Sequence, residues 1–226
     1  VGTMKNWTSF ASLTLLLAAS SVSGFLSGSA AFARSHAADL RPASIRTPAR
    51  LRGGAVSMSS AKTIVEKDVD AVGDKLCDMV AAAATTAISE KGHFAFAIPG
   101  GSILNMLMGM NTKYADVDWS KATMAYVNHR CVPLDDETST HHKARNKFLS
   151  QWQDKGLDVI LLTGSTDADA EAAAYTKAMK DLPESILPRD AASGMPVFDM
   201  MLIGVGLDGH IGSLYPESSQ VLEEKE

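Results

Sequence analysis

The sequence predicts a three-layer α/β fold, in which a mostly parallel sheet lies between helices on both faces. Short, almost wholly apolar segments alternate along residues 65–206 with longer segments whose apolar residues recur every three or four positions. Strands that are apolar along their whole length are typical of parallel sheets buried on both faces. The chain has 226 residues, of which 46% are hydrophobic and 21% charged, and this composition suits one globular domain with appended segments.

The first predicted element is a helix over residues 65–90. Its apolar residues form one stripe at three- and four-residue spacing: Val69, Val72, Leu76, Met79, Val80 and Ala83. Cys77 is expected in the core beside this stripe, and Gly92 is expected to end the helix. Three elements follow, namely a strand over 93–98, a turn over 99–102 and a helix over 103–110.

The rest of the body continues the alternation. Three more strands are expected, over residues 122–127, 157–162 and 198–206. Two more helices are expected, over residues 141–154 and 167–182. Because ligands bind outside the carboxyl ends of parallel strands, a site is expected where three loops meet: 99–102, 128–140 and 206–216.

Residues 1–60 differ in composition from the body. Residues 1–33 are predicted to be signal peptide-like, because Lys5 precedes an apolar run over 10–22 that small residues follow. That run is shorter than the roughly 20 apolar residues of a membrane span. Residues 34–60 are predicted to be disordered and transit peptide-like, since they hold five arginines against one acid. A basic linker is the alternative.

Together these segments resemble the bipartite presequence of algae with complex plastids. The resemblance implies a plastid location, and the cytoplasm is the expectation otherwise. The body, residues 61–226, keeps 15 of the 21 basic and 25 of the 26 acidic residues, a formal net charge of −10. This acidity argues against nucleic acid as the main partner, and no membrane contact is expected of the mature body.

Neither the cysteines nor the histidines form a metal-binding pattern. Cys77 and Cys131 show no paired spacing, which favours a reducing compartment. The six histidines lack zinc-ligand spacing, and the adjacent His141 and His142 would diverge at the start of a helix. No metal site is therefore expected.

The turn over 99–102 places two glycines and a serine directly after a predicted strand. Gly100 and Gly101 allow the backbone to approach a ligand closely. Ser102 can cap the following helix, whose free N–H groups bind anions. These residues alone are consistent both with phosphate binding and with an ordinary strand-to-helix turn.

The loop over 128–140 presents Arg130 close to the end of a predicted strand. A guanidinium in this position suits recognition of phosphate or carboxylate through two hydrogen bonds. The alternative is a surface ion pair with a nearby acid: Asp135, Asp136 or Glu137.

Residues 204–209 satisfy the pattern G-x-G-x-x-G at the end of the last predicted strand. A dinucleotide fingerprint should open a long helix in the first βα unit. Here His210 follows at once, and Pro216 limits any helix to one or two turns. What remains is Asp208 and His210 on a glycine-rich loop, where a histidine can take a proton from water at neutral pH. The alternative is a histidine that only makes hydrogen bonds within its own loop and has no chemical role.

Three motifs resemble the 6-phosphogluconolactonases, a family in the glucosamine/galactosamine-6-phosphate isomerase superfamily. FDMMLIGVGLDGHIGSLYPES is similar to the family's Phe-Asp strand followed by G-x-G-x-D-G-H-x-[AG]-S-[LF]-[FY]-P. FAFAIPGGS is similar to its first strand and Gly-Gly-Ser loop, and WSKATMAYVNHRCVPLDDETST to its Asp-Glu-Arg-x-Val-Pro-x-Asp loop. Order and spacing agree over about residues 65–218, and they imply a modified Rossmann-type fold of the phosphosugar isomerase/lactonase kind.

The resemblance implies an enzyme that hydrolyses 6-phospho-D-glucono-1,5-lactone to 6-phosphogluconate in the oxidative pentose phosphate pathway. His210 would act as the general base on water, and Asp208 would help to orient the loop or the imidazole. No metal or organic cofactor is implied.

The resemblance also implies the residues that bind the substrate. Gly100, Gly101 and Ser102 would line the substrate site with backbone donors, and Arg130 would hold the phosphate. Backbone N–H groups would stabilise the oxyanion.

The chain departs from the family pattern in two places. Asn128 and His129 stand where the family has Asp-Glu before the arginine, and Thr138-Ser-Thr-His141 stands where it has Asp-Ser-Asn-Tyr. The family's domain also continues beyond residue 226, so the chain resembles a form truncated at its carboxyl end.

Two other functions stay open. A catalytically weak or silent sugar-phosphate-binding relative is one, because Asn128 and His129 replace two acids. A glucosamine-6-phosphate isomerase-type enzyme is the other. It is disfavoured because those isomerases use an aspartate where Asn128 stands, and an amide cannot abstract a proton. Their last motif also continues with Phe-Asn-Glu-Pro, whereas this chain has Ser213-Leu-Tyr-Pro216.

Overall fold

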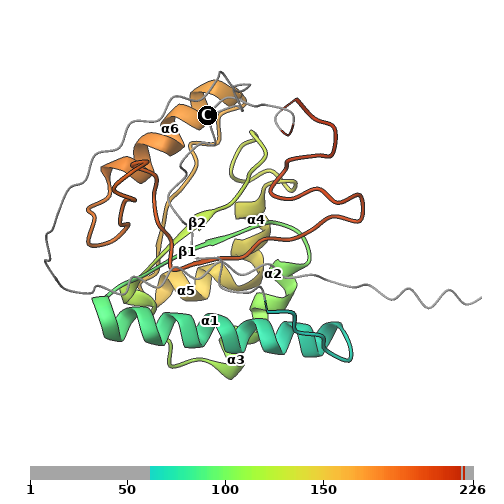
Figure 1. The fold of residues 1–226 in the computed structure, drawn as a ribbon, viewed down its shortest axis with the longest axis vertical. Helices are drawn as coiled ribbons and strands as arrows, with labels where there is room; N and C mark the ends of the chain where they lie inside the picture. The colour runs from blue at the N-terminus through green and yellow to red at the C-terminus, as the bar shows by residue number, and fades with distance from the viewer. Residues whose placement is uncertain (1–61, 220, 222–226) are drawn as a thin grey trace, which may run out of the picture. The chain divides into compact units, whose positions relative to one another are not determined.

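The computed structural model describes residues 62–219 and residue 221. Four parallel strands form one sheet in the order β3-β2-β1-β4. Helices cover both faces of this sheet (Figure 1), which confirms the predicted three-layer α/β fold. The predicted signal and transit segments, residues 1–33 and 34–60, lie outside the described residues.

Helix α1 spans Val69–Lys91, close to its predicted bounds. Asp68 caps its start, since Oδ1 accepts the backbone N–H of Ala71 at 2.8 Å. Gly92 ends the helix in the left-handed region with φ of 82°. Cys77 is buried as predicted, and burial raises the pKa of its thiol to about 11.

The two central strands carry the hydrophobic pattern that predicted them. Strand β1 spans Phe94–Ile98 and strand β2 spans Ala122–Tyr126, and every residue of both is buried. The two strands pair in parallel along their whole length. A 3-10 turn at Trp119–Lys121 leads directly into β2.

The two outer strands are shorter than predicted. Strand β3 spans Asp158–Val159 and strand β4 spans Met200–Met201, against expected strands over 157–162 and 198–206. Among the described residues each pairs with a single neighbour, and one further backbone hydrogen bond of 2.9 Å continues each pairing before it stops. An apolar run therefore predicted the strand but not the length over which a partner is present.

Asp199 fixes β4 against β1. Its Oδ2 accepts the backbone N–H of Ala95 at 2.7 Å, and its own N–H donates to the Ala95 carbonyl at 2.8 Å. Its Oδ1 forms an ion pair with Lys91 at 2.8 Å. These contacts lie directly before β4 and set which residues of the two strands face each other.

The helices between the strands are built from several short segments. The predicted helix over 103–110 consists of α2 (Ile103–Met106), a 3-10 turn (Leu107–Gly109) and α3 (Met110–Lys113). The predicted helix over 141–154 consists of α4 (Thr140–Ala144), a π-helical turn (Arg145–Leu149) and α5 (Ser150–Asp154). Helix α6 spans Ala168–Asp181. Within the described range, no helix is both long and apolar enough to cross a membrane.

The two faces of the sheet carry side chains of different size, because successive residues of a strand point to opposite faces. Larger side chains pack against α1, α2, α3 and α5: Phe94, Phe96, Ile98, Met124 and Tyr126. Alanines point to the opposite face, where α6 lies (Figure 1): Ala95, Ala97 and Ala125. The small side chains allow α6 to pack close to the strands.

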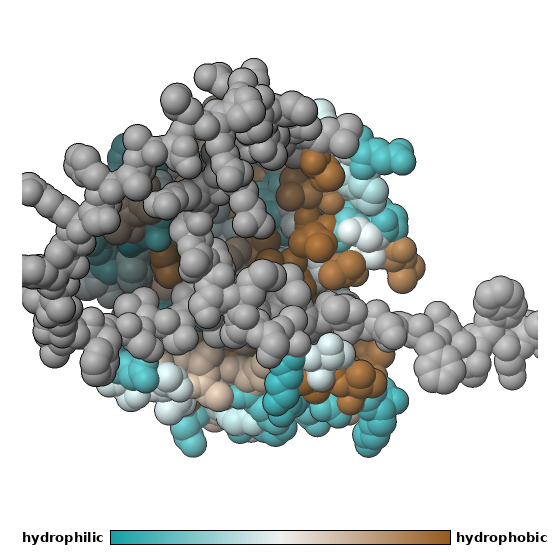
Figure 2. All heavy atoms as spheres, viewed as in Figure 1, coloured by the Kyte–Doolittle hydropathy of each residue, from teal (hydrophilic) through white to brown (hydrophobic). Residues whose placement is uncertain are grey.

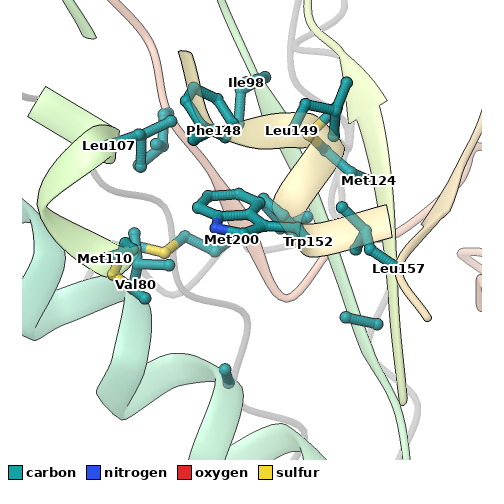
Figure 3. Packing of buried hydrophobic residues seen from close by; sticks show 14 of the residues in the cluster. Val80, Ile98, Leu107, Met110, Met124, Phe148, Leu149, Trp152, Leu157 and Met200 are labelled. Atoms are coloured by element: carbon teal, nitrogen blue, oxygen red, sulfur yellow. The ribbon is translucent and has the colours of Figure 1, made fainter. Parts of the chain in front are cut away.

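Trp152 of α5 lies at the centre of the larger core. Its ring stacks on Trp119 with centroids 4.1 Å apart, and its centroid is 4.4 Å from that of Phe148. Its indole N–H donates to Oδ1 of Asn111 at 2.7 Å. Figure 3 shows this ring among side chains from α1, α3 and the strands. Trp152 is thus fully buried where the helices pack against the sheet.

Replacing Trp152 with alanine is expected to lower the free energy of unfolding by about 3–5 kcal/mol, because a large cavity would remain. Trp152→Phe keeps most of the apolar volume and loses the bond to Asn111, so about 1–3 kcal/mol is expected. Urea unfolding of the full-length protein measures both. Met108→Ala, at a side chain that is 44% exposed, is the control and should change stability by less than about 0.5 kcal/mol.

Candidate functional site

The three predicted loops meet at the carboxyl ends of β1, β2 and β4. A Cβ placed on Gly100 would lie 3.1 Å from Oγ1 of Thr140, which brings the first loop to the second. A Cβ placed on Gly212 would lie 3.7 Å from Cγ1 of Val127, which brings the third loop to the second. The strand order requires this meeting, because β1 lies between β2 and β4. The predicted convergence is therefore confirmed.

The turn after β1 leaves backbone donors without partners. Gly101 adopts φ of 81°, a conformation that glycine favours. No acceptor in the described part of the chain bonds the N–H groups of Gly100, Gly101 or Ser102. Unpaired N–H groups that point from a strand end are a natural site for an anionic group.

The expected cap at Ser102 is wrong. Its backbone has φ of −64° and ψ of −26°, which is already helical, and its side chain accepts no N–H. A capping residue needs an extended backbone for its side chain to reach the next turn. Ser102 instead contributes its carbonyl, which accepts the N–H of Asn105 at 3.0 Å.

Arg130 is exposed on the loop after β2. Among residues 62–219 and 221 it forms no ion pair, so the alternative of a surface pair with Asp135, Asp136 or Glu137 is not observed. Asp136 instead accepts the N–H and the hydroxyl of Thr138, and these bonds hold the pKa of its carboxyl below the ordinary value. The Arg130 guanidinium has no hydrogen bond to the turn at 100–102 or to His210 within the described residues.

Asn128 and His129 lie just after the end of β2 with unpaired polar atoms. Asn128 donates from Nδ2 to Oγ of Ser213, while its Oδ1 is buried without a partner in the described structure. Both ring nitrogens of His129 are also buried without a partner there. Burial lowers the pKa of His129, which favours the neutral imidazole. Three polar atoms thus lie unpaired at the end of a strand.

His141 and His142 take separate roles, as their adjacency predicts. His141 is buried, and its Nδ1 lies 2.8 Å from the hydroxyl of Tyr126. His142 instead pairs with Asn146, one turn along the helix, at 2.9 Å. Burial lowers the pKa of His141. Within residues 62–219 and 221, no three His, Cys, Asp or Glu side chains lie close enough together to hold a metal ion.

The glycine-rich segment after β4 forms two successive turns. The N–H of Gly209 donates to the carbonyl of Gly206 at 2.9 Å, and the N–H of Gly206 donates to the carbonyl of His210 at 2.8 Å. The second turn is closed between Ile211 and Leu214. No helix follows the glycines within the described residues, which agrees with the rejection of a dinucleotide fingerprint.

Asp208 and His210 form a hydrogen-bonded pair at the surface of this loop. Nδ1 of His210 lies 2.6 Å from Oδ1 of Asp208, which also accepts the backbone N–H of His210 at 3.2 Å. The bond from the imidazole, and then that from the backbone, hold the pKa of the Asp208 carboxyl below its ordinary value. With Nδ1–H donating to the carboxylate, the lone pair of Nε2 is free to accept a proton. Tyr215 packs against the imidazole, with ring centroids 4.7 Å apart.

Gly206 is required by the pair itself. A Cβ placed on it would lie 2.2 Å from Nδ1 of His210 and 2.6 Å from Oδ1 of Asp208. No side chain tolerates such distances, so residue 206 must be glycine for the imidazole to lie across the turn. The glycines therefore make room for a histidine rather than for a nucleotide.

Apolar side chains gather beside this loop (Figure 2), over the chain that follows β4. Four exposed ones belong to the loop or lie shortly after it: Leu207, Ile211, Leu214 and Tyr215. A separate cavity of about 310 Å³ lies between α1 and the segment 102–109, and Ser102 is the residue it shares with the site. The chemistry-bearing pair lies on the apolar, exposed loop and not in this cavity.

The fold and these loops define a class of protein, a parallel α/β domain that presents a His–Asp pair and unpaired backbone donors on the loops at the carboxyl ends of its strands. The sequence profile of the family described as glucosamine-6-phosphate isomerases/6-phosphogluconolactonase matches residues 67–226. The chain therefore belongs to this family.

Two plant proteins illustrate the similarity. The chain is 34% identical over 140 residues to "Probable 6-phosphogluconolactonase 4, chloroplastic" of Oryza sativa subsp. indica, covering 61% of this chain and 43% of that protein. It is 30% identical over 175 residues to "Probable 6-phosphogluconolactonase 5" of Arabidopsis thaliana, covering 74% of this chain and 69% of that protein. The chain thus spans less than half the length of the rice relative.

Solved structures share the fold. The 6-phosphogluconolactonase of Trypanosoma brucei superimposes with a TM-score of 0.57 at 24% identity, covering 69% of this chain and 64% of that chain. The 6-phosphogluconolactonase of Leishmania guyanensis gives a TM-score of 0.58 at 21% identity, covering 72% of this chain and 66% of that chain.

Replacing Gly206 with alanine is expected to displace His210 from Asp208, because the new methyl group would overlap the imidazole ring. The chemical shifts of the His210 imidazole, followed by NMR in the full-length protein, should move toward those of the Asp208→Asn variant. Gly204→Ala is the control, since the added Cβ would meet only Cδ1 of Ile103 there, at an ordinary contact distance of 3.7 Å. Unchanged His210 shifts in Gly206→Ala would contradict the described geometry.

Proposed function

We propose that the protein hydrolyses 6-phospho-D-glucono-1,5-lactone to 6-phosphogluconate in the oxidative pentose phosphate pathway. The observation that carries this proposal is the pair of His210 and Asp208 with Nε2 free, held at the carboxyl edge of a parallel sheet. Membership of the family and the names of the plant relatives support it.

In this proposal His210 is the general base. Nε2 removes a proton from a water molecule as its oxygen attacks the lactone carbonyl carbon. Asp208 holds the proton on Nδ1 and stabilises the imidazolium that forms. The tetrahedral intermediate then breaks the bond to the ring oxygen, which takes the proton back from Nε2. The products are one hydroxyl and one carboxylic acid, which loses its proton to water at neutral pH, and neither step needs a metal or an organic cofactor.

The remaining site residues bind the substrate. Arg130 is exposed and has no ion-pair partner within the described residues, so its guanidinium is available to hold the phosphate. The unpaired N–H groups of Gly100, Gly101 and Ser102 line the site with donors. Donors of this kind stabilise negative charge on the carbonyl oxygen as the intermediate forms.

A silent sugar-phosphate binder is the second candidate, and the amide of Asn128 and the imidazole of His129 are the observations that favour it. Neither supplies the negative charge of the acids found elsewhere in the family. An isomerase acting on glucosamine 6-phosphate is less consistent with the site, because Asn128 cannot abstract a proton.

His210→Ala in the full-length protein is expected to lower kcat for the lactone by about 10²–10⁴-fold, the usual contribution of a general base. Arg130→Ala is expected to raise KM and leave kcat less affected, because binding is lost. Hydrolysis of freshly made lactone is compared with its spontaneous rate, and Lys143→Ala, at an exposed residue of α4, is the control.

A wild-type rate equal to the spontaneous one overturns the proposal. Ligand-induced thermal stabilisation without turnover would favour the silent binder, and release of ammonia from glucosamine 6-phosphate would favour the isomerase.

We also propose that residues 1–60 direct the protein to a plastid. Their signal-like and transit-like composition supports this, as does the word chloroplastic in the name of the rice relative. A fusion of residues 4–60 to a fluorescent protein should accumulate in plastids of an alga with complex plastids. Replacing the five arginines of 34–60 with glutamine should prevent entry, and a uniform cytosolic signal from the unchanged fusion would refute the proposal.

A further inference from the structure

Ser213 occupies a backbone position that favours glycine. It follows Gly212 in the turn from Ile211 to Leu214, whose ends exchange hydrogen bonds of 2.8 and 3.2 Å. The two central residues have φ of 56° and 68°, and turns with both central φ values positive prefer Gly or Asn. A serine there carries a conformational cost that glycine would not. Such a residue persists when its side chain contributes something that glycine cannot.

The side chain of Ser213 bonds to the end of β2. Its Oγ accepts a hydrogen bond from Nδ2 of Asn128, a residue 85 positions earlier in the chain. Asn128 lies two residues after the last residue of β2, so its position is set by the sheet. The hydroxyl of Ser213 therefore joins a surface turn to the rigid part of the fold.

Ser213 lies three residues after His210, and backbone hydrogen bonds connect the segment between them to the strand end. Ile211 forms an antiparallel bridge to Val205, and the carbonyl of His210 accepts the N–H of Gly206. The turn that begins at Ile211 is thus continuous with the backbone that carries the imidazole. Fixing the turn at Ser213 therefore restrains the backbone that carries the imidazole.

We propose that Asn128 and Ser213 are positioning residues, whose hydrogen bond holds the His210 loop in its active geometry. This inference rests on the proposed lactone hydrolysis. It also gives the replacement of the family's acid by Asn128 a defined role. A hydroxyl can both donate and accept a hydrogen bond. The Ser213 hydroxyl accepts one from the amide of Asn128, and it could donate one to a carboxylate in the same position.

The experiment compares four variants of the full-length protein. Ser213→Gly keeps the turn and removes the hydroxyl, and Asn128→Leu removes the partner. Both should lower kcat about tenfold or more with KM changed less than about twofold, because a misplaced base slows chemistry rather than binding. Asn128→Asp should keep about half of the wild-type kcat or more, since its carboxylate accepts the Ser213 hydroxyl.

Glu217→Gly is the matched control. Glu217 is exposed and also has a positive φ, 63°, in the same segment, so the change relieves backbone strain without touching the hydrogen bond. It should leave kcat unchanged. The thermal unfolding temperature should not fall in Glu217→Gly, since this change removes strain and no hydrogen bond.

Hydrogen exchange separates this inference from the proposed function. In Ser213→Gly and Asn128→Leu, the amides of residues 206–214 should exchange about tenfold faster than in wild type and Glu217→Gly. Wild-type protein without lactonase activity would overturn the proposed function, while faster exchange would still support the hydrogen bond. A wild-type kcat and wild-type exchange in Ser213→Gly would overturn the positioning role, and so would an Asn128→Asp variant as impaired as Asn128→Leu.

Discussion

The parallel pairing of β1 with a strand on each side is the constraint on which the site depends. The loops after β1, β2 and β4 meet because these three strands are neighbours and run in one direction. A slip of one residue in any pair would move a loop by about 3.3 Å, more than the length of a hydrogen bond. Asp199 prevents this slip for β4, since its carboxylate and its backbone both form hydrogen bonds with Ala95.

The geometry at the end of β4 shows how a short loop holds the imidazole of His210 against the carboxylate of Asp208. The absence of a side chain at Gly206 leaves the space that the imidazole of His210 occupies. Asp208 then bonds both the ring and the backbone of the same histidine. The loop is exposed, so its order depends on few contacts, and the bond from Asn128 to Ser213 is the side-chain contact that ties it to the sheet within the described structure.

The sequence predicted the layers and the meeting of the three loops because both follow from the alternation of apolar strands with helices. Fully apolar segments indicated β1 and β2, and the glycine-rich loop with Asp208 and His210 was recognisable from three ordered motifs. The lengths of β3 and β4 were overestimated, because an apolar run does not reveal how far a neighbouring strand extends. The cap at Ser102 was wrong for a related reason, since the residue type does not determine whether the backbone there is extended or helical.

Contacts between distant segments were beyond what the sequence could indicate. Nothing in the local pattern shows that Asn128 reaches Ser213, or that Gly206 is needed because of the imidazole of His210. The unpaired atoms of His129 follow from burial, which depends on the whole fold.

The central claim is that a phosphosugar acid or lactone binds where the three strand ends meet. NMR titration of the full-length protein with the proposed product, 6-phosphogluconate, tests it most directly. We expect the largest shift changes on the amides of residues 100–102, on Arg130 and on the His210 imidazole. Changes confined to the cavity between α1 and the segment 102–109, at Gly73 and Asn105, would contradict it.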